Sequence, residues 1–331
     1  MEPALTPSHP PTTVYQAIHS PDVSDATRRL IQASISENTK VAYDKALTKL
    51  NHWLAGRTLT DLLLAEYLTH CHEEGLAPTS IALIPAAIGF AARLVGEEAP
   101  IGDITKQALD GIRSNGQTRG AGQVTGITFT ETKFLTAQIA KNGVRGIRDA
   151  ALFSLMSDCM LRIGELVAVR PLDIHSVDDG SGRLHIPRSK TDQGGRGVTL
   201  YIGPPTMERI RDWTHLIEEQ LGGVDERAPL FRTVRKGGHI QSGGISMGGV
   251  RWNLKTYVKA AGLEGRFSGH SFRVGTAQSL ARQGATLTQM QTVGRWKTSR
   301  MPAAYCRNEL AGRSAVATLL YKNEGEDATG G

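Results

Sequence analysis

Residues 268–275 place a histidine and an arginine three positions apart. The glycine and serine that flank His270 are typical of a helix start, and side chains at positions i and i+3 of a helix project to the same side. His270 and Arg273 are therefore expected on one face of a helix N-terminus, where backbone N–H groups already favour an anion. Taken alone, however, a His-x-x-Arg pair is more often surface decoration or part of a salt bridge.

Two further segments carry charged groups that could act on a phosphate. Arg162 follows the apolar run at residues 150–160, and an arginine there is costly to bury unless it is paired or meets an anion. Glu165, three residues later, is a candidate partner, although an ordinary surface Arg–Glu pair explains the spacing equally well. Lys190 is expected at the tip of a β-hairpin, where its ammonium is either solvated or within reach of a reacting oxygen.

Read together, these segments resemble the catalytic core of the tyrosine recombinases, the phage-integrase type of site-specific recombinase. The resemblance covers residues 145–310 and depends on five motifs that follow the family's order and spacing, including nine residues from Trp296 to Tyr305. The motifs are Leu161-Arg162-Ile163-Gly164-Glu165, Arg188-Ser189-Lys190-Thr191, Gly269-His270-Ser271-x-Arg273-Val274-Gly275, Gly294-Arg295-Trp296 and Tyr305-x-Arg307-Asn308. Many relatives carry histidine where this chain has Trp296, and no catalytic position of the pattern is vacant.

The resemblance implies an enzyme that breaks and rejoins DNA through a 3′-phosphotyrosine intermediate. Tyr305 would be the nucleophile, and its phenol, with an ordinary pKa near 10, needs a neighbouring base or a field of cations. Arg162 and Arg273 would each give bidentate hydrogen bonds to phosphate oxygens, and His270 and the indole of Trp296 would complete the cage. Removing one such donor typically costs roughly 3–4 kcal/mol of transition-state stabilisation.

The same resemblance assigns supporting roles to two further residues. Lys190 would act as the general acid that protonates the departing 5′-oxygen. Glu165 would orient its neighbours or help the proton balance. Because the phosphotyrosine bond conserves the energy of the broken DNA link, no cofactor and no metal are expected.

Helical periodicity dominates residues 24–115. Tyr43, Leu47, Leu50 and Leu54 fall on one face of a helix that Ser36 or Asn38 could cap. Further runs are expected at residues 60–74, after Pro78 with a kink or register break at Pro85, and at residues 104–113. This segment is interpreted as an all-α core DNA-binding domain of four or five helices. Residues 1–23, rich in proline, are expected to form a disordered tail.

The glycine-rich residues 116–128 predict a linker, and residues 129–331 are interpreted as the catalytic domain. Alternating apolar residues on either side of positions 190–195 predict a β-hairpin within residues 183–202. Helices are expected at residues 131–141, 146–158, 204–221, 249–261, 270–283, 286–293 and 309–320. The fold class is therefore mainly α, with an α+β catalytic domain that contains a small antiparallel sheet. The resemblance implies that the two domains close like a clamp around duplex DNA.

Composition narrows the class of protein without deciding it. The net charge is +6, with 9 Lys/Arg against 13 Asp/Glu in residues 1–115 and 29 against 19 in the remainder. That excess suits a nucleic-acid partner, although a solvated surface explains it almost equally well. No apolar run is long enough to span a membrane, and the three cysteines do not form a disulfide pattern, so a cytoplasmic protein is expected, nucleoid-associated when bound to DNA.

Other chemistry-bearing groups fit a specific site less well. His70, Cys71 and His72 diverge in direction on a helix, so no metal site is predicted there. The glycines between Gly237 and Gly249 lack the ending of a nucleotide-binding loop and are interpreted as a connection. Three basic residues before them could touch DNA phosphates or be solvated. They are Arg232, Arg235 and Lys236.

The expected partner is double-stranded DNA with a specific recombination site built from inverted repeats. The resemblance implies a dimer on each site, a homotetramer in the synaptic complex, and strand exchange through a four-way junction. A C-terminal helix with apolar Ala315, Val316, Leu319 and Leu320 would dock on a neighbouring subunit or fold onto its own domain. Two rival functions are a type IB topoisomerase-like enzyme that relaxes DNA and a DNA-binding or architectural protein that never cuts.

Overall fold

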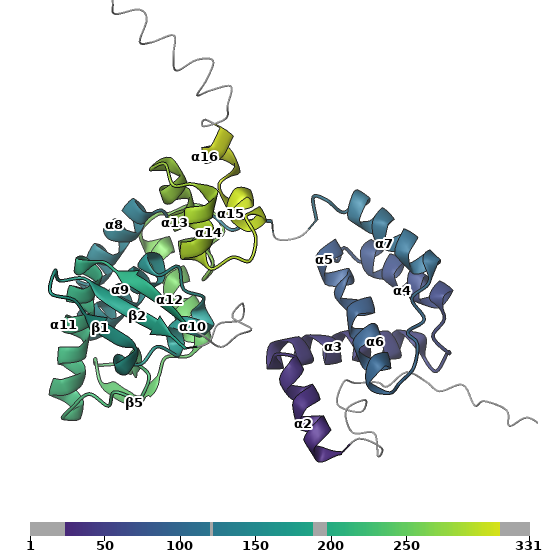
Figure 1. The fold of residues 1–331 in the computed structure, drawn as a ribbon, viewed down its shortest axis with the longest axis horizontal. Coiled ribbons are helices and arrows are strands. Elements are labelled where there is room, and N and C mark those ends of the chain that lie inside the picture. The colour runs from purple at the N-terminus through teal and green to yellow at the C-terminus, as the bar shows by residue number, and fades with distance from the viewer. Residues whose placement is uncertain (1–23, 120–121, 188–196, 312–331) are drawn as a thin grey trace, which may run out of the picture. The chain divides into compact units, whose positions relative to one another are not determined.

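A computed structural model describes residues 24–119, 122–187 and 197–311. The chain divides into two compact units, Met1–Gly122 and Gln123–Gly331, and the division falls inside the glycine-rich stretch for which the sequence predicts a linker. Each unit is considered by itself. The fold class predicted from the sequence, mainly α with small antiparallel sheets, is confirmed (Figure 1). None of the helices in the described part of the chain combines the length and apolar character needed to cross a bilayer.

The first unit contains only helices among its described residues. Their bounds are α2 Asp25–Ser34, α3 Glu37–Leu54, α4 Asp61–Glu73, α5 Pro78–Ile81, α6 Leu83–Leu94 and α7 Asp103–Asn115. Ser36, one of the two candidate caps, accepts a hydrogen bond from the backbone N–H of Thr39 and starts α3. Leu47, Leu50 and Leu54 of α3 are buried in the core of this unit, as their spacing predicts.

The interruption expected at Pro85 occurs three residues earlier. The chain breaks between α5 and α6 at Ala82, whereas Pro85 is the third residue of α6. Proline is tolerated there because the first backbone N–H groups of a helix have no partner inside it. This break, together with α2, gives the described part of the unit six helices, one more than the upper expectation.

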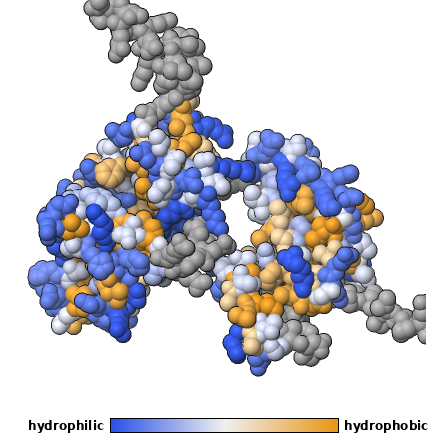
Figure 2. Space-filling model, viewed as in Figure 1, coloured by the Kyte–Doolittle hydropathy of each residue, from blue (hydrophilic) through white to orange (hydrophobic). Residues whose placement is uncertain are grey.

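The second unit is organised around a buried helix, α9. Nearly every residue from Arg148 to Ser157 in α9 is buried, and α8, α11 and α13 pack against it. The helices are α8 Phe129–Ile139, α9 Gly143–Asp158, α10 Ile163–Val167, α11 Pro204–Leu221, α12 Met247–Ala260, α13 Ser271–Arg282, α14 Leu287–Gly294, α15 Arg300–Tyr305 and α16 Arg307–Ala311. Hydrophilic residues dominate the face of this unit that Figure 2 shows.

The predicted hairpin is present as β2 Gly182–Ile186 and β3 Val198–Ile202, which pair antiparallel with Leu184 opposite Leu200. A third strand that the sequence pattern did not reveal, β1 Ile174–Ser176, pairs with β2. The glycines interpreted as a connection belong to a second hairpin, β4 Arg232–Val234 and β5 Ile240–Gly244, and to the start of α12. Gly237 and Gly238 make its turn with φ values of +87° and +84°, which favour glycine.

A close backbone approach fixes α13 in place. Gly275 in α13 lies so close to the segment before α8 that an added Cβ would overlap the carbonyl oxygen of Ile127. The backbone N–H of Ile127 donates to the carbonyl of Ser271 at 2.9 Å, which locks the same pair of segments. Since α13 begins beside His270 and carries Arg273, this contact sets the position of both side chains.

Gly275→Ala is expected to lower the free energy of unfolding by about 1–3 kcal/mol or more, because overpacking here displaces backbone. Thermal unfolding of the full chain would show a lower melting temperature for the transition of the second unit. The matched control is Gly243→Ala in β5, which has open space around its added Cβ. Equal melting temperatures for the two variants would contradict the steric account.

Candidate active site

The second unit contains a cavity of about 310 Å³ that collects most of the predicted catalytic side chains. It is lined by Arg162, His270, Arg273, Trp296, Lys297, Thr298, Met301 and Tyr305, and we call it the arginine pocket. Five of these eight residues are predicted from the motifs, and they come from segments as far apart in the chain as α10 and α15. Lys190 lies outside the described residues.

Arg273 is the most deeply placed cation of the pocket. It is 2% exposed and donates hydrogen bonds to the backbone carbonyls of Met160 and Gly294, the latter at 2.6 Å from Nη2. Its guanidinium lies 5.0 Å from the ring centroid of Trp296. Burial, and then the neighbouring positive charges, lowers the pKa of Arg273 to about 10, so the side chain still carries its charge at neutral pH. An anion in the pocket would relieve that repulsion.

Arg162 is held by a carboxylate behind it. Its Nη1 donates to Oε1 of Glu165 at 2.8 Å, and its backbone N–H donates to Oε2 at 2.9 Å. Burial works to raise the pKa of Glu165, but the charge of Arg295 and the bonds from Arg162 outweigh it and hold that pKa below its ordinary value. Glu165 is therefore ionised and anchors Arg162. The alternative explanation of the spacing, an ordinary surface Arg–Glu pair, does not fit, because the Glu165 side chain is only 10% exposed.

His270 stands at the N-cap of α13, where its position beside Arg273 matches the spacing argument. The ring remains exposed on one side, yet its pKa is lowered by partial desolvation and by the charges of Arg273 and Arg162. A histidine with a lowered pKa is neutral at pH 7, so one of its ring nitrogens is able to accept a proton.

Trp296 and Tyr305 both line the pocket, and their aromatic rings contact each other. Their ring centroids are 5.7 Å apart with the planes at 65°, an edge-on contact that gives the half-buried tyrosine a defined place. Gly294 makes room for the indole, because a Cβ there would overlap the Trp296 ring. The side-chain amides of Gln123 and Gln278 both lie 3.4 Å from the Tyr305 carbonyl, which ties the end of α15 to α13.

Arg295 is a residue of this site to which the sequence assigned no role. Its Nη2 donates to Oε2 of Glu165 at 2.9 Å and to the Met160 carbonyl at 3.1 Å. The only sequence signal was its place beside Trp296, because the contact to Glu165 spans 130 residues. Three further residues that line the arginine pocket also gave no signal in the sequence, because their place in the pocket depends on residues distant in the chain. They are Lys297, Thr298 and Met301.

The three basic residues proposed as DNA contacts separate in the structure. Arg232 is 3% exposed and its guanidinium donates to the backbone carbonyl of Ser242 in β5, so it stabilises the β4–β5 hairpin and is not available to DNA. Arg235 and Lys236 are exposed at the turn of that hairpin. The prediction for Arg232 was wrong because strand pairing, which draws the side chain inward, was not visible in the sequence.

The His70-Cys71-His72 sequence lies in α4 and its members point apart. Cys71 is buried in the core of the first unit, whereas His70 stacks on Trp53 with ring centroids 6.3 Å apart. Among the residues that the structure describes, no group of three or more histidine, cysteine or acidic side chains is arranged to hold a metal ion.

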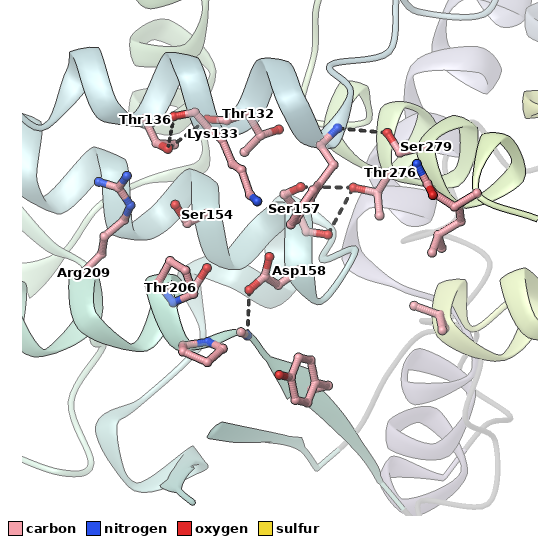
Figure 3. Close-up of a pocket in the computed structure, with 18 residues that line it drawn as sticks. Thr132, Lys133, Thr136, Ser154, Ser157, Asp158, Thr206, Arg209, Thr276 and Ser279 are labelled. Atoms are coloured by element: carbon pink, nitrogen blue, oxygen red, sulfur yellow. Dashed lines mark hydrogen bonds between the residues drawn. The ribbon is translucent and has the colours of Figure 1, made fainter. Parts of the chain in front are cut away.

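A larger concavity of about 460 Å³ lies elsewhere on the second unit, between α8, α9, α11 and α13 (Figure 3). Its only carboxylate, Asp158, accepts a hydrogen bond from the Gly203 N–H at 2.9 Å, and burial raises its pKa. Thr276 and Ser157 are hydrogen-bonded to each other at the edge of this concavity. None of the predicted catalytic side chains that the structure describes lines it, and it exposes the apolar Phe129, Tyr201 and Val293.

A helical unit is joined to an α+β unit whose pocket gathers arginines, a histidine and a tyrosine, an arrangement that suits an anionic ligand and a candidate nucleophile. Models of two families match this chain: the phage integrase family over residues 127–311, and the phage integrase N-terminal SAM-like domain over residues 28–94. The chain belongs to the phage integrase family, and the resemblance to tyrosine recombinases seen in the motifs is confirmed.

Known relatives cover both units. The chain is 25% identical over 282 residues to recombinase Cre of Escherichia phage P1, covering 77% of this chain and 78% of that protein. It is 26% identical over 290 residues to an integrase/recombinase XerD homologue of Selenomonas ruminantium, covering 84% of each. Among solved structures, XerH site-specific recombinase bound to difH in a post-cleavage complex has a TM-score of 0.66 at 16% identity, covering 90% of this chain and 85% of that one. That similarity shows the shared fold.

NMR titration of the His270 ring is expected to give a pKa below the ordinary value of ~6.5. Arg162→Gln should raise that pKa, because it removes a positive charge that disfavours the imidazolium. The His270 signal is assigned by its loss in His270→Asn, and Arg211→Ala, an exposed arginine of α11, serves as the control. A pKa at or above the ordinary value, or one unmoved by Arg162→Gln, would refute this description of the pocket.

Proposed function

We infer that the protein is a tyrosine-type site-specific DNA recombinase. The observation that carries this conclusion is the arginine pocket, in which two guanidiniums, an imidazole and an indole surround one space with Tyr305 at its wall. Membership of the phage integrase family, with relatives named as recombinases over most of their length, supports it. The roles of the individual residues are proposed below.

Arg162 and Arg273 bind the non-bridging oxygens of one DNA phosphate. Attack on a phosphodiester builds further negative charge on these oxygens, and fixed guanidiniums in a partly dry pocket stabilise it without reorganising. The Trp296 indole adds one N–H donor that cannot titrate. Lysine would serve poorly at either arginine position because it lacks the planar pair of donors.

Tyr305 attacks the phosphorus through its phenolic oxygen. A phosphorus–oxygen bond to tyrosine forms, the bond to the 5′-oxygen breaks, and the phosphate stays joined to the 3′ side of the strand. Neutral His270 accepts the phenol proton or passes it on, consistent with its lowered pKa. The reverse reaction, with a 5′-hydroxyl from another strand, rejoins DNA and releases Tyr305, so the energy of the link is conserved and no cofactor or metal takes part.

Lys190 supplies the proton that the departing 5′-oxygen needs. The assignment comes from its place in the motif pattern, since the residue itself lies outside the described part of the chain. Lys297 is the one other ammonium among the described residues that line the arginine pocket, and it is the rival for this role.

The substrate is duplex DNA carrying a specific site built from inverted repeats, on which two copies bind and four assemble. Ala315, Val316, Leu319 and Leu320 lie outside the described residues, and in this proposal they dock on a neighbouring copy. The concavity of Figure 3 offers apolar surface of suitable size for such side chains. Among the described residues it shares no lining residue with the arginine pocket, which is therefore left free to hold DNA during assembly.

Tyr305→Phe is expected to abolish the covalent protein–DNA adduct while DNA binding is retained, because only the nucleophilic oxygen is lost. Covalent complexes are trapped with denaturant from a DNA library of randomised inverted repeats, in buffer with EDTA, and the recovered sequences are read. Tyr201→Phe, an exposed tyrosine of β3, is the matched control and should form the adduct normally.

Several outcomes would contradict this proposal. Adduct formation by Tyr305→Phe would remove Tyr305 from its role, and an absolute need for divalent metal would contradict the mechanism. Adducts without sequence enrichment, together with relaxation of supercoiled plasmid, would instead indicate a topoisomerase. Binding without any adduct would indicate a non-catalytic DNA-binding protein.

Lys190→Ala is expected to slow cleavage by roughly 10²–10⁴-fold with DNA binding retained, as for loss of a general acid. A substrate with sulfur in place of the departing 5′-oxygen should restore the rate, because a thiolate leaves without protonation. Lys297→Ala is tested beside it. Rescue by the sulfur substrate in Lys297→Ala and not in Lys190→Ala would reassign the acid.

A further inference from the structure

Arg295 adopts a backbone conformation that normally selects glycine. It is the C-cap residue that directly follows α14, with φ 55° and ψ 44°. Fourteen of the seventeen residues with positive φ in the described part of the chain are glycines, and the exceptions are Ala55, Met160 and Arg295. A side chain in this region costs roughly 1 kcal/mol or more. Two of the three exceptions touch each other at the arginine pocket, because the Arg295 guanidinium donates to the Met160 carbonyl.

The Arg295 side chain turns inward from this position. It is 6% exposed, and Nη2 donates at 2.9 Å to Oε2 of Glu165, whose Oε1 accepts from Arg162 at 2.8 Å. Glu165 thus bridges two guanidiniums. The Met160 carbonyl bridges two as well, since it accepts from both Arg273 and Arg295. Arg295 is the one group that touches both anchors, yet it is not among the described residues that line the arginine pocket.

We propose that Arg295 is a positioning residue that fixes Glu165 and the Met160 carbonyl, and through them the two phosphate-binding guanidiniums of Arg162 and Arg273. This inference rests on the proposed function. Arg295 acts without touching DNA, so its contribution appears in the chemical step and in the protonation of Glu165.

Charge balance gives the physical reason for a third arginine. Glu165 orients Arg162, but its negative charge also cancels part of the attraction that the pocket offers to a phosphate. Arg295 pairs with that carboxylate from behind, so that Arg162 and Arg273 keep their two positive charges for the DNA. Without Arg295, the Glu165 carboxylate would be balanced only by Arg162 and Arg273. The net positive charge that the pocket presents to a phosphate would then be lower by one.

The same contact predicts a pH dependence. The groups that face Glu165 are Arg162 beside α10, Arg295 after α14, and His270 and Arg273 of α13. Burial works to raise the pKa of Glu165, and Arg295 is the largest influence that lowers it. Removing Arg295 therefore raises the pKa of Glu165. Cleavage needs the ionised carboxylate. As the pH is lowered, the variant would therefore lose cleavage activity at a higher pH than the wild-type chain does.

The test compares Arg295→Gly and Arg295→Lys with the wild-type chain on a DNA site recovered by covalent trapping. Glycine removes the guanidinium and relieves the backbone strain, which offsets part of the stability lost with the buried ion pair, so the variant should fold with a lowered melting temperature. Its single-turnover cleavage is expected to fall roughly tenfold or more, with the dissociation constant for DNA changed by less than about threefold. The acid limb of its rate profile should move to higher pH.

Arg295→Lys separates charge from geometry. It should return the acid limb towards the wild-type position, because an ammonium also stabilises the carboxylate, while the plateau rate stays low because the two-anchor geometry is lost. A double-mutant cycle with Glu165→Gln should be strongly non-additive, since both changes act through one contact. Arg211→Ala controls for a general loss of charge.

The outcomes are distinguishable from failure of the proposed function. If the wild-type chain forms no adduct, the recombinase assignment fails. If the wild-type chain cleaves and Arg295→Gly matches it in rate and pH profile, the assignment stands and the positioning role is overturned. Full additivity with Glu165→Gln would overturn it as well, because Arg295 would then act independently of the carboxylate. If Arg295→Gly does not fold, Arg295→Lys and its pH profile decide.

Discussion

The repulsion among guanidiniums gathered in one partly buried pocket is the constraint on which the catalytic unit depends. The guanidiniums of Arg162, Arg273 and Arg295 gather there, and burial together with this repulsion lowers the pKa of Arg273 to about 10. Two acceptors, the Glu165 carboxylate and the Met160 carbonyl, hold the three side chains. Mutual repulsion makes such a cluster favour an anion, and in the proposed function a DNA phosphodiester supplies that negative charge.

Close packing of backbone makes that cluster possible. Gly275 admits the Ile127 carbonyl, Gly269 admits the Ile163 side chain, and Gly294 lies under the Trp296 ring. The first two contacts join α13, or the residue just before its N-cap, to another part of the unit, and the third lets the Trp296 ring lie against the end of α14, so the glycines set the distances at which the charged groups meet. Glycine in the family motifs is therefore a requirement of packing as well as of turn geometry.

Local sequence patterns predicted the features that depend on neighbouring residues, such as where a helix begins and which of its faces is buried. The periodicity of Leu47, Leu50 and Leu54 predicted α3, and the flanks of His270 predicted the start of α13 with Arg273 on the same side. What depended on distant partners was not predictable. The inward turn of Arg232 follows from pairing of β4 with β5, and the role of Arg295 follows from a carboxylate 130 residues away. Neither residue differs in type from a solvated arginine, so no pattern distinguishes them.

The pocket also explains why proton transfer is best kept apart from charge stabilisation. Cleavage and rejoining pass through the same kind of pentacoordinate phosphorus, so the cage must carry the same charge in both directions. Arginine at a pKa of about 10 and a non-titrating indole meet that requirement, whereas a cation that lost its proton in one step would have to regain it before the next. In the proposed mechanism the proton therefore belongs to other groups: neutral His270 for the phenol, and a lysine for the departing oxygen.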